Sequence, residues 1–122
     1  MGDSRGNGCK TLQDVPMAQV KWNKKAERVF FARVLYANNE FGAATARKWQ
    51  DERKRIEHQL EKFPESYTPE SLLKNRRHHF RSCHIMSRFK IVCYYAKTSD
   101  VVRIVDVWDT KMSPENLKQR IK

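Results

Sequence analysis

The chain has 122 residues, of which 25 are Lys or Arg and 14 are Asp or Glu, so its formal net charge is +11. Its 39% hydrophobic and 32% charged residues are typical of one globular domain with a modest core, which excludes collagen-like and wholly disordered chains. No apolar run approaches the roughly 20 residues of a membrane-spanning helix, and the amino terminus lacks the apolar stretch of a secretory signal, so we expect a cytoplasmic protein with no membrane partner.

Residues 1–16 are predicted to be a flexible leader. They contain three of the four glycines and almost no large apolar side chain. Regular patterns begin only at Met17, so we expect a single folded domain over residues 17–122. Met17 is also a candidate natural start, which would make the leader non-native or place it upstream of the true start.

The first part of this domain predicts a strand followed by a helix. Val20–Trp22 is a short strand candidate, and Asn23 stands at the N-cap position of a helix over residues 24–39. The apolar residues of this helix cover more than one narrow stripe, which predicts contacts with two neighbours.

A second helix follows a break at Gly42. Apolar residues recur at helical spacing over residues 43–62, and Pro64 closes the helix. The two helices therefore form a helical hairpin. The same spacing places Trp49 and Phe63 in the core.

The remainder of the chain predicts an antiparallel sheet, and the fold class is therefore α+β. Residues 64–77 are interpreted as a loop that holds a short turn at 71–73. Three β-rich runs then form a meander, and a short basic helix begins at Ser113-Pro114 and runs through Ile121. The three runs are His78–Ile85, Phe89–Ala96 and Val101–Trp108.

Pairing Ile85 with Phe89 and Ala96 with Val101 sorts the strand residues into two faces. The apolar face, which we expect the helices to cover, holds His79, Arg81, Cys83, Phe89, Ile91, Cys93, Tyr95, Val102, Ile104, Asp106 and Trp108. The opposite, cationic face holds His78, Phe80, Ser82, His84, Lys90, Val92, Tyr94, Arg103 and Val105. Asp106 is unexpected on an apolar face, so it either pairs with Arg81 or indicates a different register.

Most of the charge excess lies in one segment. Residues 74–103 hold eight basic residues against the single acidic residue Asp100, which predicts a polyanionic partner such as nucleic acid. A basic surface kept for solubility or for an acidic protein is the alternative. The candidate contacts to RNA or another target are Lys74, Arg76, Arg77, His78, His79, Arg81, Arg88 and Lys90.

The cationic face has the residue types for metal-free phosphodiester cleavage, in which a 2′-hydroxyl attacks the adjacent phosphate. That reaction needs a base, a proton donor and fixed positive charge. His84 or Tyr94 would transfer protons, while Arg103, Lys90 and Arg81 would hold the phosphate. The alternative is structural, with His84 a surface residue and Tyr94 a partner of Phe80 that stabilises the sheet.

No cofactor or metal site is predicted. Cys9, Cys83 and Cys93 show no CxxC spacing and cannot all pair, so reduced thiols are expected. The histidines beside Cys83 lack the spacing of zinc ligands.

Residues 18–109 resemble the RelE/ParE superfamily of bacterial type II toxins, which includes plasmid stabilisation proteins. The resemblance rests on the order of the elements and on four short segments. These are Val20-Lys21-Trp22 running into Ala26, Phe41-Gly42-Ala43-Ala44, Phe63-Pro64, and Phe80-Arg81 followed by Phe89-Lys90-Ile91-Val92-Cys93-Tyr94. The last run is similar to the family's pattern of aromatic, basic, two aliphatic, any and aromatic residues.

The resemblance implies a small toxin that forms a hetero-oligomer with an acidic antitoxin. The RelE-like branch is an mRNA endoribonuclease acting on the ribosome without metal, and the ParE-like branch inhibits DNA gyrase. The basic segment favours mRNA cleavage slightly, although Val107-Trp108-Asp109-Thr110 stands where many nucleolytic members carry Tyr or His. An inactive relative that only binds antitoxin is the third alternative. The first helix and the basic tail Lys118–Lys122 are candidate antitoxin contacts.

Overall fold

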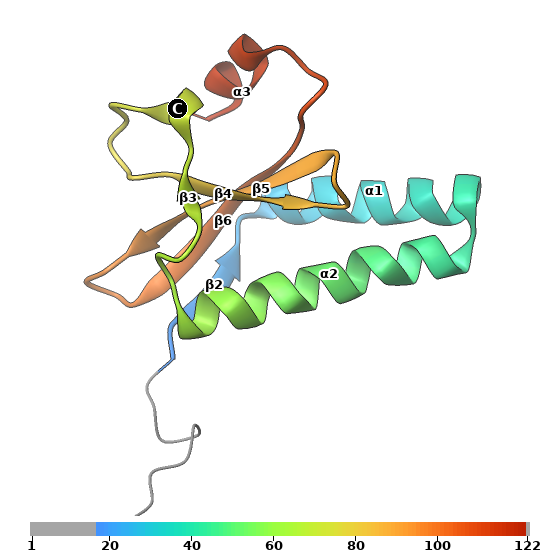
Figure 1. Ribbon diagram of the computed structural model, residues 1–122, viewed down its shortest axis with the longest axis horizontal. Coiled ribbons are helices and arrows are strands. Elements are labelled where there is room, and N and C mark those ends of the chain that lie inside the picture. The colour runs from blue at the N-terminus through green and yellow to red at the C-terminus, as the bar shows by residue number, and fades with distance from the viewer. Residues whose placement is uncertain (1–16, 122) are drawn as a thin grey trace, which may run out of the picture.

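Two helices pack along one face of a mixed sheet, and a third, short helix lies on the other side (Figure 1). The computed structural model describes residues 17–121, so the predicted leader over 1–16 lies outside the described residues. The elements in chain order are β2 (Gln19–Trp22), α1 (Lys24–Phe41), α2 (Ala43–Lys62), β3 (Thr68–Pro69), the 3-10 turn η2 (Ser71–Leu73), β4 (Arg81–Ile85), β5 (Phe89–Ala96), β6 (Val101–Asp109) and α3 (Pro114–Arg120). The predicted α+β class is confirmed.

The helical hairpin is confirmed, with α1 extending two residues beyond the predicted end. Gly42 joins the helices at φ 94°, a conformation that L side chains rarely adopt. Along α2, Trp49, Ile56 and Leu60 are buried at helical spacing. No helix within residues 17–121 combines the length and apolar character needed to cross a membrane.

The prediction that Phe63 belongs to the core is wrong. Its side chain is 58% exposed. Helix α2 ends at Lys62, and Phe63 has non-helical dihedrals of φ −135° and ψ 77°. The helical period that would have turned this side chain inward therefore stops one residue before it.

The sheet has the strand order β2-β6-β5-β4-β3. The predicted meander and both predicted pairings, Ile85 with Phe89 and Ala96 with Val101, are confirmed. Strand β2 adds to β6 in parallel. Two details differ from the prediction, because β4 begins at Arg81 rather than at His78, and the predicted loop supplies the two-residue edge strand β3.

A β-bulge in β6 corrects the predicted faces of Asp106 and Trp108. Cys93 pairs with Ile104, but the preceding residue Val92 pairs with Asp106, so Val105 is an extra residue in β6. One inserted residue shifts the alternation of every later side chain. Asp106 and Trp108 therefore lie on the face opposite α1 and α2, and Asp106 pairs with Arg120 instead of Arg81.

Each face of the sheet carries its own apolar core. On the helix side the buried residues include Phe30, Trp49, Ile56, Leu60, Ile85, Phe89, Ile91, Cys93, Val102, Ile104 and Val107. On the other side a second cluster consists of Leu73, Phe80, Val92, Trp108, Leu117 and Ile121. The face predicted to be cationic is thus partly covered by η2 and α3.

Arg53 joins β2 to both long helices. Its guanidinium binds Glu27 on α1 at 2.5 and 3.2 Å and Glu57 on α2 at 3.1 Å, and it stacks over the ring of Trp22 at 4.0 Å. Trp22 Nε1 also donates to Glu57 at 2.7 Å. This ion pair and cation–π contact fix the beginning of α1 against α2.

Candidate functional site

Arg103 lies at the centre of the partly open face of the sheet. In register it stands between Lys21 on β2 and Tyr94 on β5. Neighbouring strands are about 4.8 Å apart, so the three side chains form a short row across the sheet. Among residues 17–121 no carboxylate forms an ion pair with Arg103 or Lys21.

His78 joins this row through Tyr94. The two rings stack with centroids 3.9 Å apart and planes 10° from parallel, and Phe80 contacts both rings edge-on at 5.9 and 5.7 Å. Tyr94, Arg103 and His78 are all half-buried. The structure therefore brings two of the three predicted catalytic side chains together, with His78 beside them.

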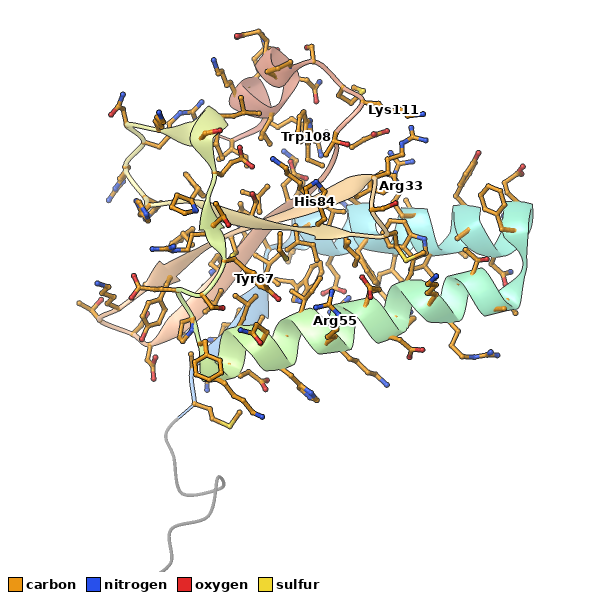
Figure 2. All side chains as sticks on the ribbon, in the orientation of Figure 1. Arg33, Arg55, Tyr67, His84, Trp108 and Lys111 are labelled. Atoms are coloured by element: carbon orange, nitrogen blue, oxygen red, sulfur yellow. The ribbon has the colours of Figure 1, made fainter. Side chains whose placement is uncertain are left out.

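His84, the third predicted catalytic residue, lies elsewhere on the same face (Figure 2). It pairs with Lys90, which is four residues from Tyr94 along β5, a separation of about 13 Å. His84 is exposed. His84 therefore does not share a site with Tyr94 and Arg103 in this structure.

Lys90 is held by a buried carboxylate. Glu70 is 4% exposed and accepts hydrogen bonds from Lys90 at 3.0 Å, from the Ser82 hydroxyl at 2.7 Å and from the backbone N–H of Leu72 at 3.1 Å. Burial alone would raise the pKa of Glu70, but these hydrogen bonds together lower it. The charge of Lys90 is therefore compensated within the fold.

Several other predicted contact residues also have partners within the fold. Arg76 donates to the carbonyls of Lys118, at 2.9 Å, and Ile121, which ties the 74–79 loop to α3. Arg81 donates to the carbonyl of Tyr67 at 2.8 Å.

Arg88 binds both carboxylate oxygens of Asp109, at 3.0 and 2.7 Å. Its hydrogen bonds lower the pKa of Asp109 to about 2. Of the predicted contacts, Lys74, Arg77 and His79 are exposed and have no ion-pair partner in the described part of the chain.

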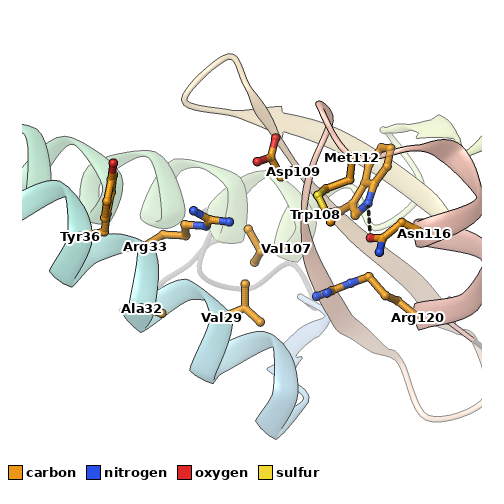
Figure 3. Close-up of a pocket in the computed structure, with 10 residues that line it drawn as sticks. All are labelled: Val29, Ala32, Arg33, Tyr36, Val107, Trp108, Asp109, Met112, Asn116 and Arg120. Atoms are coloured by element: carbon orange, nitrogen blue, oxygen red, sulfur yellow. Dashed lines mark hydrogen bonds between the residues drawn. The ribbon is translucent and has the colours of Figure 1, made fainter.

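A cleft of about 390 Å³ lies between α1, the end of β6 and α3 (Figure 3). Its walls are Val29, Ala32, Arg33, Tyr36, Val107, Trp108, Asp109, Met112, Asn116 and Arg120. Because β2 ends opposite Ile104, the edge of β6 beyond that residue has no strand beside it here. Trp108 Nε1 donates to Asn116 at 3.2 Å, and Arg120 donates to both oxygens of the fully buried Asp106 at 2.7 Å.

Sequence reasoning missed this cleft. Two signals pointed toward it, namely the wide apolar stripe of α1 and the unexpected Asp106. The two predicted neighbours of α1 are present, namely α2 and strand β6, yet the stripe still leaves Phe31, Leu35 and Tyr36 more than half exposed.

Burial raises the pKa values of three side chains that lie between the sheet and α2. It raises the pKa of Cys83 to about 11 and that of Cys93 to about 12. Tyr67, whose hydroxyl is buried without a hydrogen-bond partner in the described structure, has its pKa raised by burial to about 12 (Figure 2). Residues 17–121 contain no group of three His, Cys, Asp or Glu side chains placed to hold a metal ion.

Comparison with solved structures shows the same fold in bacterial toxins. The chromosomal ParDE system from P. aeruginosa superposes with a TM-score of 0.60 at 14% identity, over 76% of this chain and 96% of that chain. A metal-bound toxin from Helicobacter pylori superposes with a TM-score of 0.55 at 17% identity, over 78% and 97% respectively. Comparison with curated proteins gave no match.

The family model that matches this sequence describes the ParE toxin of the type II toxin-antitoxin system parDE. It matches residues 20–114, which include most of β2, the helical hairpin and the complete meander. Family membership implies an antitoxin partner. The chain belongs to the ParE toxin family of type II toxin-antitoxin systems.

Proposed function

We propose that this toxin arrests growth by binding and inhibiting DNA gyrase rather than by cleaving mRNA. The observation that carries the proposal is the Lys90–Glu70 pair at 3.0 Å. Lys90 occupies the basic position of the strand pattern shared with the superfamily, and a cation already neutralised by a buried carboxylate is a poor stabiliser of a pentavalent phosphate. Trp108, near the position where nucleolytic members carry Tyr or His, is buried against α3.

The test is expression of the chain in a bacterium without antitoxin. We expect growth arrest with gyrase-linked DNA breaks and intact mRNA. A host whose gyrase carries toxin-resistance substitutions should continue to grow. Arrest with no DNA breaks, or arrest that persists in that host, would contradict the proposal.

Ribosome-associated mRNA cleavage, the function that the sequence favours slightly, is the second candidate. The observation that supports it is the contact of Tyr94 with His78 beside Arg103. New mRNA 5′ ends inside codons, lost in Arg103→Ala but kept in Arg47→Ala at an exposed position on α2, would support cleavage at this position. Absence of any growth arrest would instead support an inactive, antitoxin-binding relative.

We also propose that the antitoxin covers the exposed side of α1. Phe31 and Leu35 are 52% and 62% exposed there, and the adjoining cleft is lined by Arg33. An amphipathic, acidic antitoxin segment matches this surface in apolar area and in charge.

Leu35→Glu should abolish co-purification of the antitoxin without changing the melting temperature of the isolated toxin. Arg47→Glu, an exposed position on α2, is the matched control and should leave co-purification intact. Antitoxin binding unchanged in Leu35→Glu would place the interface elsewhere.

A further inference from the structure

Exposed and half-buried cations extend from the edge strand β2 to the 74–79 loop. Lys21 and Arg103 are adjacent in register, and Tyr94 follows on the next strand. His78 stacks on Tyr94 and lines, with Arg77 and Lys74, a depression of about 250 Å³. We call this surface the basic-aromatic row, comprising Lys21, Arg103, Tyr94, His78, Arg77 and Lys74.

Carboxylates on this side of the sheet do not compensate the row. Glu70 is 4% exposed and bound to Lys90, and Asp106 is fully buried and bound to Arg120. Asp100, in the nearby turn, accepts a hydrogen bond from the Tyr95 hydroxyl at 2.6 Å. The positive charges of the row are therefore not neutralised by these carboxylates, and they create a positive potential in the adjacent solvent.

The loop end of the row is fixed in place. Arg76 anchors the loop by donating to the carbonyls of Lys118 and Ile121, so its guanidinium is engaged at the carboxyl-terminal end of α3. Its neighbour Arg77 is exposed and has no ion pair within residues 17–121. Because Arg76 anchors the loop, the backbone keeps Arg77 and Lys74 beside His78. Less backbone entropy is then lost on binding.

We propose that the basic-aromatic row binds single-stranded nucleic acid through its phosphates, with one base stacking on the His78–Tyr94 pair. A flexible strand presents phosphates and unpaired bases together, which matches cations interleaved with half-buried rings. Duplex bases are already stacked and cannot reach these rings. An acidic protein would satisfy the cations but leave the aromatic pair unused.

The test is fluorescence anisotropy of the purified full-length chain with labelled oligothymidylate and oligouridylate of about a dozen nucleotides. Four phosphates neutralised by Lys21, Arg103, Arg77 and Lys74 predict a slope of log affinity against log salt of about −3. Arg103→Ala should make that slope less steep, at about −2. Comparison of the two oligonucleotides distinguishes DNA from RNA as the natural strand.

Substitution of Tyr94 tests the stacking contribution separately from the charge contribution. Tyr94→Leu should weaken binding about ten-fold or more with the salt slope unchanged, and Tyr94→Phe should restore it. Arg47→Ala, which removes an exposed cation from α2, is the matched control and should have no effect.

Three results would overturn the inference. These are equal losses in Arg47→Ala and Arg103→Ala, tight binding in Tyr94→Leu, and polyglutamate competing as well as the oligonucleotide, which would indicate an acidic protein partner. The readout requires neither gyrase nor growth arrest, so failure here leaves the proposed function standing.

Discussion

At the scale of single residues, Glu70 is the side chain on which the surrounding polar groups most depend. It accepts hydrogen bonds from Lys90, Ser82 and the backbone of Leu72. Glu70→Ala should lower the free energy of unfolding by about 2–3 kcal/mol, because it leaves a partly buried ammonium group unpaired. The double variant Glu70→Gln with Lys90→Met should recover part of that loss in urea unfolding. Equal stability of Glu70→Ala and the unsubstituted chain would show that the pair contributes nothing.

The same carboxylate makes stability depend on pH. Because the pKa of Glu70 is lowered in the folded chain, its contribution is complete above the ordinary Glu pKa of about 4.3 and is lost as pH falls through the lowered pKa. The stability difference between the unsubstituted chain and Glu70→Gln should therefore be constant near neutral pH and shrink below about pH 4. Urea unfolding of both chains across that range measures it, and a difference independent of pH would contradict the assignment.

Cys83 and Cys93 should be unreactive in the folded protein. Burial raises their pKa values to about 11 and about 12, so near pH 8 almost no thiolate is present to attack an alkylating agent. Mass spectrometry after iodoacetamide treatment should find both residues unmodified in the native chain and modified in urea. Rapid native modification of either would show that this region opens.

At the scale of elements, the turn between β4 and β5 carries local strain. Met86 and Ser87 have φ values of 53° and 58°, in the left-handed region that costs a side-chain-bearing residue about 1–2 kcal/mol. Ser87→Gly should raise the free energy of unfolding by about 0.5–1 kcal/mol after its greater chain entropy is subtracted. Asp100→Gly, at φ 56°, is the comparison and should gain less, because it removes the hydrogen bond from Tyr95. A loss of stability in Ser87→Gly would show that its side chain supports the turn.

Sequence patterns predicted the elements because their signals are local. Helical spacing from Trp49 to Leu60 and the alternation of β5 each need only neighbouring residues. The bulge at Val105 has no such signal, and it alone reversed the faces of Asp106 and Trp108.

The candidate site was less predictable than the elements. Whether Lys90 is available depends on Glu70, which lies 20 residues away in the predicted loop. Tyr94 and Arg103 were placed together because both lie within the correctly predicted Ala96–Val101 pairing. His78 precedes β4, and its stacking on Tyr94 depends on the path of the loop rather than on strand alternation.

At the scale of the whole molecule, one sheet supports two cores of unequal size. The long helices close the first core, and only η2 and α3 close the second. Arg120 and Arg76 anchor α3, one through buried Asp106 and the other through backbone carbonyls. The carboxyl-terminal segment is thus part of the folded unit, and its removal would uncover Trp108 and Val92.

Substitutions of two leucines test the stability of the fold and the binding of the antitoxin independently. Leu117 on α3 is fully buried in the second core, whereas Leu35 on α1 is 62% exposed. Leu117→Ala should cost about 2–4 kcal/mol in the free energy of unfolding, because it leaves a cavity, while Leu35→Ala should change it by less than about 0.5 kcal/mol. Antitoxin affinity should show the reverse order, with Leu35→Ala the weaker binder. Urea unfolding and calorimetric titration of the two variants measure both quantities, and a destabilised Leu35→Ala would contradict the assignment of Leu35 to the binding surface.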